Sequence, residues 1–284
     1  MYSLKPKVGH IQFLNCLPLY YGLVKNHALL DIELIKGTPT VLNDLLIKGV
    51  LDISPISSIE YARHCDSLVL FPDFTVSSDG EVKSILLISR FPIEELSGKK
   101  IALTNTSATS HVLLKLILGH AYAVNPEYLI AHHNVNRMLT DADAALLIGD
   151  IALKYSVDTK DFFLYDLGIE WKKLTGKKMV YAVWAVNRRF DKTQSALSRY
   201  VFEIIKKSMD YSTKHLQEIA EYAARWEPFS PTFLKEYFKS LRFNFGEDYQ
   251  EGLLLFYKMA TENGSLQTIP ELEFIPLRSE VTVR

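Results

Sequence analysis

Short apolar strands and helices alternate along the first ninety residues, and this alternation restricts the fold more than any other feature of the chain. Segments 8–13, 31–37, 51–55 and 68–72 have the apolar character of short strands, and stretches with helical spacing separate them. Strands that alternate with helices are typical of parallel βαβ units. We therefore expect an open α/β sheet in this part of the chain.

A second group of strand and helix signals lies between two apolar segments, 82–90 and 179–188. Its strands are predicted at 100–104, 128–131 and 144–149 and its main helix at 110–121, and the chain turns strongly helical after residue 190. One architecture explains this order: the chain leaves a first lobe, builds a second lobe and returns. This predicts an α/β protein with a two-lobed fold like that of type II periplasmic binding proteins, with a central cleft and two hinge crossings.

The predicted lobe boundaries follow from the two apolar segments. We expect lobe I to contain residues 1–88 and 187–284, with a helical C-terminal part, and lobe II to contain residues 89–186.

The composition excludes several classes of protein. The 284 residues include 32 basic and 33 acidic side chains, and no Lys/Arg block indicates a nucleic-acid partner. Two cysteines are too few for a disulfide framework. The N-terminal residues lack the apolar core of a signal peptide, and the apolar run after them is too short to span a membrane. We expect a cytoplasmic protein that is neither secreted nor membrane-bound, and the sequence leaves its oligomeric state open.

Polar side chains gather where predicted strands end. Asn15 follows the first strand, and Pro18 then suits the first turn of a helix. Ser57 and Ser58 follow another strand, and Ser84 begins an otherwise apolar one. Open α/β sheets present ligand-binding groups at such positions.

The fourth polar group lies between a strand and a long helix and suits an anion. Five of the six residues from 105 to 110 are polar. A helix N-terminus has unpaired N–H groups and a partial positive charge, so it binds a carboxylate or phosphate. Ordinary helix capping is the simpler explanation of such residues, but one cap needs only one of them. The binding candidates in this group are Thr106, Ser107, Ala108, Thr109 and Ser110.

Gly149 and Asp150 follow a buried apolar run, where Asp150 either caps the next helix or contacts a ligand hydroxyl. His132 and His133 have no carboxylate cluster at ligand spacing, so we expect no metal site. No Walker loop, GxSxG or HExxH motif is present.

Five stretches together resemble the chorismate dehydratase family of the futalosine route to menaquinone. They are IQFLNCLPLYYGL (11–23), GTPTVLNDLLIKGVLDISPISSIEYA (37–62), LFPDFTVSSDGEVKSILLIS (70–89), LSGKKIALTNTSATSHVLLKLIL (96–118) and DAALLIGDIAL (143–153). The resemblance implies a hydro-lyase without a cofactor that converts chorismate, a dianion, to 3-[(1-carboxyvinyl)oxy]benzoate and water. It implies catalytic roles for Asn15 and Ser84, and binding roles for Ser57, Ser58, Ser107, Thr109 and Ser110.

Two alternatives of different kinds stay open at this point. A non-catalytic solute-binding protein for small anions has the same fold, because fold does not decide function. The dihydroxynaphthoate synthase of the same pathway is expected to carry a catalytic histidine, whereas Asn15 stands at this strand end. Among the core motifs, Glu60 and Asp150 provide the only carboxylates, and no histidine is present. This suggests that the substrate's own carboxylate removes the proton.

Overall fold

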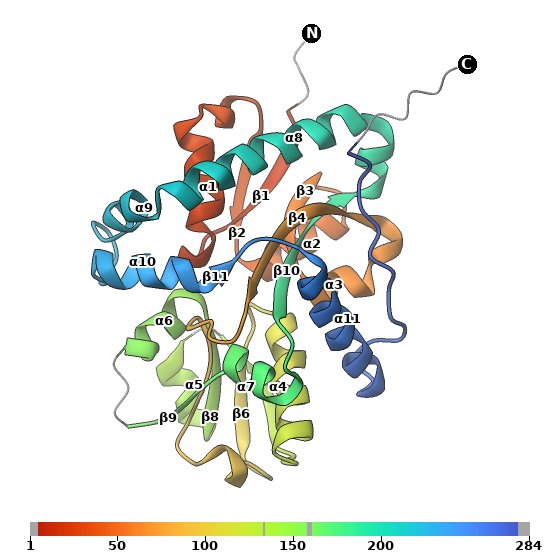
Figure 1. Ribbon diagram of the computed structural model, residues 1–284. Coiled ribbons are helices and arrows are strands. Elements are labelled where there is room, and N and C mark those ends of the chain that lie inside the picture. The colour runs from red at the N-terminus through yellow and green to blue at the C-terminus, as the bar shows by residue number, and fades with distance from the viewer. Residues whose placement is uncertain (1–4, 133, 158–160, 278–284) are drawn as a thin grey trace.

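The computed structural model describes residues 5–132, 134–157 and 161–277, which form two sheets flanked by helices (Figure 1). The first sheet has the strand order β11-β4-β10-β3-β1-β2. Its strands are β1 (Lys7–Ile11), β2 (Glu33–Gly37), β3 (Ile53–Ser57), β4 (Leu68–Ser78), β10 (Met179–Asn187) and β11 (Leu241–Arg242). β1 is parallel to β2 and β3, whereas β10 is antiparallel to β3 and β4.

The second sheet has the order β7-β6-β8-β5-β9. Its strands are β5 (Ile85–Ser89), β6 (Lys100–Thr104), β7 (Glu127–Ala131), β8 (Ala144–Ile148) and β9 (Phe163–Asp166). β6 is parallel to β7 and β8, and β5 is antiparallel to β8 and β9. We call each sheet with its helices a lobe, and the two-lobed α/β fold expected from the sequence is confirmed.

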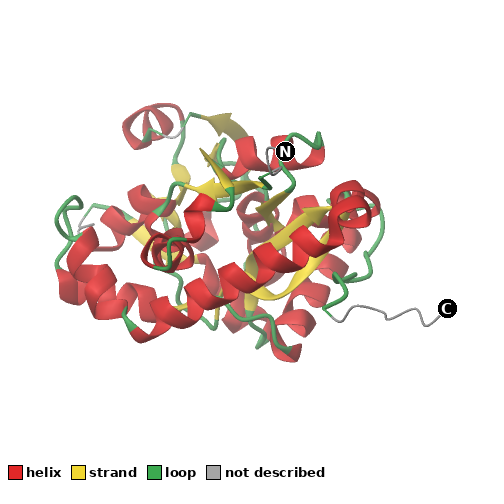
Figure 2. Cartoon of the chain, turned by 90° about the horizontal axis from the view of Figure 1, so that it is seen from above, coloured by secondary structure: helices red, strands yellow, loops and turns green. Residues whose placement is uncertain are grey.

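Helices cover both sheets. In the first lobe they are α1 (Leu17–Lys25), α2 (Pro39–Ile47), α3 (Ser58–Arg63), α8 (Arg188–Lys214), α9 (Leu216–Ala223), α10 (Pro231–Ser240) and α11 (Glu247–Glu262). In the second lobe they are α4 (Thr109–Ala121), α5 (Val135–Asp141), α6 (Gly149–Val157) and α7 (Leu167–Thr175). Seen from above, the long α8 lies across the first lobe (Figure 2).

Local sequence signals explain several helix ends. Pro18 lies in the first turn of α1 and Pro39 in that of α2, where a missing N–H has no cost. Gly49 has φ +70° just after α2, a backbone conformation that glycine adopts without strain.

The points where the chain changes sheets differ from the predicted boundaries at residues 88 and 187. β5 pairs within the second sheet and β10 within the first, so the chain crosses to the second sheet over residues 79–84. It returns after β9 through α7, which packs on the second lobe, and residues 176–178. Apolar composition marks a strand as buried but does not say which sheet it joins, and this explains the difference. We therefore propose a division of the two lobes at these crossings.

The carboxylate of Asp166 ties the two crossings together. It accepts hydrogen bonds from the N–H groups of Val82 (3.0 Å) and Lys83 (2.6 Å) in the first crossing. It also caps α7 through Gly168 (2.9 Å) and Ile169 (3.1 Å). Burial raises the pKa of Asp166, and these backbone hydrogen bonds oppose the shift. One side chain thus holds both connections between the lobes.

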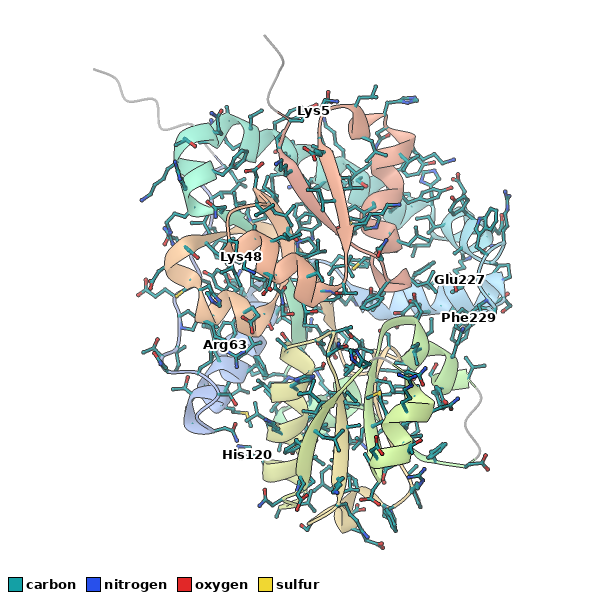
Figure 3. The ribbon with its side chains drawn as sticks, turned by 180° about the vertical axis from the view of Figure 1, so that it is seen from behind. Lys5, Lys48, Arg63, His120, Glu227 and Phe229 are labelled. Atoms are coloured by element: carbon teal, nitrogen blue, oxygen red, sulfur yellow. The ribbon has the colours of Figure 1, made fainter. Side chains whose placement is uncertain are left out.

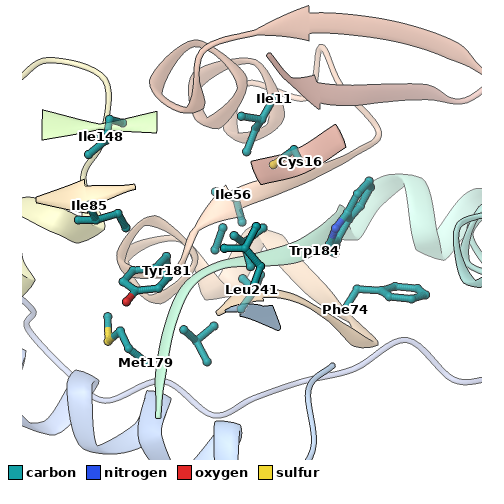
Figure 4. Packing of buried hydrophobic residues seen from close by; sticks show 14 of the residues in the cluster. Ile11, Cys16, Ile56, Phe74, Ile85, Ile148, Met179, Tyr181, Trp184 and Leu241 are labelled. Carbon is teal, nitrogen blue, oxygen red and sulfur yellow. The ribbon is translucent and has the colours of Figure 1, made fainter. Parts of the chain in front are cut away.

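Apolar side chains from both lobes form one cluster. Figure 4 shows Ile85 and Ile148 of the second sheet on one side, with Ile11, Cys16 and Ile56 of the first lobe on the other. The lobes are therefore packed against each other in this structure.

The contact between the crossings leads to a first prediction. A Cβ at Gly168 would lie 2.1 Å from the carbonyl oxygen of Gly80, so Gly168→Ala forces the two crossings apart. We expect it to lower the free energy of unfolding by about 1–3 kcal/mol, the usual cost of overpacking. Gly119→Ala is the control, because a Cβ there has open space inside a helix, and we expect a gain of about 0.5–1 kcal/mol. Denaturant titrations that rank the two variants equally would contradict this account.

Candidate functional site

Asn15 lies on a short 3-10 turn, Leu14–Cys16, between β1 and α1. β1 ends at Ile11, four residues before Asn15 and two residues earlier than the strand end predicted from the sequence. The Oδ1 atom of Asn15 is buried and finds no hydrogen-bond partner in the part of the chain that the structure describes. A buried amide oxygen without a partner is costly, and a ligand can satisfy it.

Ser84 ends the first crossing, directly before β5. Its side chain is buried, and its hydroxyl donates a long 3.3 Å hydrogen bond to the Val82 carbonyl. Its own carbonyl accepts a 2.8 Å hydrogen bond from the Gly149 N–H. Tyr237 of α10 lies beside it: burial raises the pKa of Tyr237, and a hydrogen bond with the Ser84 side chain opposes the shift.

Asn15 and Ser84 line the same cavity between the lobes. The cavity has a volume of about 60 Å³. It is lined by residues without a formal charge: Ile11, Phe13, Asn15, Cys16, Pro39, Ser57, Val76, Ser84, Ile85, Ser107, Ile148, Gly149, Tyr181 and Ala182. A cavity of roughly 150 Å³ holds benzene, so a larger ligand enters here only if the walls move apart.

Three of the other predicted residues line this cavity. Ser57 is held by Asn43, whose Nδ2 donates to the Ser57 hydroxyl over 3.1 Å. The Ser107 hydroxyl accepts a 3.4 Å hydrogen bond from the Ser110 N–H at the start of α4. Gly149 also lines the cavity. Neutral groups next to a helix N-terminus therefore face the cavity, and they suit a carboxylate.

Ser58 and Thr109 lie between the two lobes, outside the cavity lining. Their hydroxyls are 3.2 Å apart, and Thr109 also accepts a 3.3 Å hydrogen bond from the Ile59 N–H. These contacts join α3 of the first lobe to α4 of the second. The pair stabilises the closed arrangement and does not line the cavity.

Three residues near the start of α4 also lie outside the lining. The Thr106 hydroxyl is 2.8 Å from that of Thr104, and Ala108 is the residue before α4. The Ser110 hydroxyl is buried and unpaired within the described residues. The polar residues of segment 105–110 therefore have different roles. Ser107 lines the cavity, whereas Thr106 pairs with Thr104 and Thr109 pairs with Ser58.

Asp150 faces the first lobe from α6. Its Oδ1 accepts a 2.9 Å hydrogen bond from the Leu14 N–H, next to Asn15. Burial raises the pKa of Asp150 to about 6; the Leu14 hydrogen bond opposes the shift and the charge of Glu227 adds to it. Asp150 lines a separate outer hollow of about 270 Å³, together with Phe13, Lys36 and Glu227.

Phe13 and Tyr181 are lining residues that the sequence analysis missed. Phe13 lies between the cavity and the outer hollow, and its ring packs on Gly149. Tyr181 is on β10, where its hydroxyl is 2.9 Å from that of Ser78. Both read as ordinary core residues in the sequence, since an aromatic side chain in a strand is usually buried.

Within the described residues, no group of three or more His, Cys, Asp or Glu side chains is arranged to hold a metal ion. His133 lies outside the described residues. No helix in the described ranges is long and apolar enough to cross a bilayer.

Comparison with known proteins supports the resemblance that the motifs indicate. A family model described as menaquinone biosynthesis matches residues 6–262. The chain belongs to this menaquinone biosynthesis family. A chorismate dehydratase of Thermus thermophilus is 33% identical over 258 residues, covering 84% of this chain and 92% of that protein. A chorismate dehydratase of Campylobacter jejuni is 26% identical over 223 residues, covering 74% and 84%. The predicted family membership is confirmed.

Solved structures support the fold. A protein from Archaeoglobus fulgidus matches with a TM-score of 0.75 at 20% identity, covering 94% of this chain and all of that one. The periplasmic aliphatic sulphonate binding protein SsuA of Escherichia coli matches with a TM-score of 0.65 at 14% identity, covering 94% and 90%. The predicted likeness to periplasmic binding proteins is confirmed at the level of the fold.

The buried carboxyl of Asp150 leads to a second prediction. Its pKa of about 6 lies above the ordinary value of 3.8, so the folded protein binds this proton more tightly than the unfolded chain. The stability contributed by the bound proton is therefore lost as the pH rises through about 6. Asp150→Asn has no such proton, so we expect its stability relative to wild type to rise by about 1–2 kcal/mol between pH 5 and pH 8. Urea titrations at both pH values measure this, and an unchanged difference contradicts it.

Proposed function

We propose that this protein is a chorismate dehydratase, a carbon–oxygen lyase that forms 3-[(1-carboxyvinyl)oxy]benzoate and water without a cofactor. The observation that carries the proposal is the shared cavity of Asn15 and Ser84, in a chain whose family relatives include two chorismate dehydratases. The substrate is a dianion, and the product is an aromatic ring.

The cavity walls suit a dianion that is bound by neutral groups. Ser57 and Ser107 come from different lobes, and each presents a hydroxyl held by a neighbouring hydrogen bond. Ser107 also precedes α4, whose N-terminal N–H groups favour negative charge. We assign the two carboxylates to these groups, so closure of the lobes binds and orients the substrate.

The reaction breaks one C–H and one C–O bond. The ring carbon next to the hydroxyl-bearing carbon loses its proton, the electron pair of the C–H bond joins the ring, and hydroxide leaves. The Asn15 amide donates a hydrogen bond to the departing oxygen, and the Ser84 hydroxyl holds the reactive conformer. Such fixed donors act where charge develops in the transition state.

A base for the ring proton is supplied by the substrate itself in this proposal. The residues that line the cavity include no imidazole and no carboxylate. We therefore assign proton removal to the enolpyruvyl carboxylate of chorismate, which is part of the bound molecule. The proton and the released hydroxide together give water, so the atoms balance.

Purified protein incubated with chorismate and a metal chelator tests this function directly. We expect the aromatic product, detected by its proton NMR signals. Asn15→Ala and Ser84→Ala should each lower kcat by about 100- to 1000-fold, because each removes a group that acts in the transition state. Their free energy of unfolding should change by about 1 kcal/mol or less.

Ser212→Ala is the control for Ser84→Ala. Ser212 is a buried serine of α8 whose hydroxyl has no partner among the described residues, and it is not part of the cavity lining. We expect its turnover to match that of the wild type. Tight binding of chorismate without any product would support the alternative of a small-anion binding protein and contradict the proposal.

A further inference from the structure

Two neighbouring residues of α6 contact the backbone on both sides of the cavity. The Gly149 N–H donates to the Ser84 carbonyl over 2.8 Å. The Asp150 carboxylate accepts from the Leu14 N–H over 2.9 Å, and Leu14 directly precedes Asn15. A single dipeptide of the second lobe therefore touches the segments that carry both proposed catalytic side chains.

We infer that Asp150 is a positioning residue: it holds the 3-10 turn of Asn15 across the cleft, at a fixed place relative to Ser84. The inference rests on the proposed function, because it concerns the alignment of these two side chains for that reaction. Asp150 itself faces the outer hollow, not the cavity, so it acts through Leu14 and not by touching the substrate.

The turn needs this outside support. Within it, the Cys16 N–H bonds to the Phe13 carbonyl over 3.0 Å and the Leu17 N–H to the Leu14 carbonyl. The residue before the turn, Phe13, makes no side-chain cap. The Leu14 N–H thus has no acceptor within the turn, and the carboxylate of Asp150 supplies one.

Packing adds a second contact to the hydrogen bond. Gly149 has φ +63°, and a Cβ there would come within 3.0 Å of the Phe13 ring. The Phe13 ring is therefore packed close to Gly149, where a side chain would not fit. Phe13 and Leu14 of the first lobe meet Gly149 and Asp150 of the second, so the turn is held at two successive residues.

The charges around Asp150 come from several elements. Glu227 follows α9 and lines the outer hollow, and Figure 3 shows it where the two lobes meet. Lys154 lies one turn along α6 and favours the carboxylate, whereas Glu227 disfavours it. Cys16 and Tyr237 face it from the first lobe, and the negative charge of Asp150 contributes to their raised pKa values.

The test compares Asp150→Ala with Asp150→Asn and with a matched control. Asparagine keeps an oxygen that can accept the Leu14 hydrogen bond, whereas alanine removes it. Asp52→Ala is the control: Asp52 also accepts one backbone hydrogen bond, from the Lys7 N–H over 2.8 Å, but within the first lobe and away from the cavity. All three variants are full-length proteins.

Hydrogen–deuterium exchange of the peptide that covers residues 11–17 is the first readout, and it is made without chorismate. We expect faster exchange in Asp150→Ala, but not in Asp150→Asn or Asp52→Ala. Turnover of chorismate is the second readout. Asp150→Ala should lose about 100-fold in kcat, as expected for a misplaced catalytic group, while Asp150→Asn keeps most of it.

Each outcome decides a separate point. Equal losses of kcat in Asp150→Ala and Asp150→Asn would assign proton transfer to Asp150 and overturn the positioning role. So would unchanged exchange at residues 11–17 in Asp150→Ala. An exchange difference between Asp150→Ala and the wild type, together with no turnover of chorismate by the wild type, would contradict the proposed function alone.

Discussion

The arrangement of the two lobes depends on one buried carboxylate at the crossings. Asp166 accepts backbone hydrogen bonds from Val82 and Lys83 in the first crossing and from Gly168 and Ile169 at the start of α7. Ser84 is the last residue of this first crossing, directly after Lys83, so the same bonds set its place at the cavity. These four N–H donors compensate the free-energy cost of burying the carboxylate. Without such partners a buried charge would be strongly destabilising.

The cavity is closed by contacts between the lobes, and its walls must move apart before a ligand can enter. Its walls come from both lobes, and its volume of about 60 Å³ is too small for a ring with two carboxylates. The contacts that cross the cleft beside the cavity include Ser58 with Thr109, Phe13 with Gly149, and Leu14 with Asp150. A small number of hydrogen bonds, each worth about 1 kcal/mol, can break and form again as a ligand enters.

Much of this structure was predictable from the sequence because its signals are local. The strand at 100–104 and the helices after residue 190 follow from apolar periodicity, and Pro18 and Pro39 mark two helix starts. The crossings were not predictable in this way, because the pairing of β5 and β10 depends on contacts distant in the sequence. For the same reason Asp150 looked like a helix cap or a ligand contact, whereas its partner, Leu14, lies 136 residues away.

A crystal structure of the Asn15→Ala variant with chorismate bound tests the central claim most directly, since slow turnover preserves the substrate. The account predicts the ring between the lobes, beside Ser84, with its carboxylates at Ser57 and Ser107. Chorismate bound in the outer hollow, or anywhere away from Ser84, would contradict it.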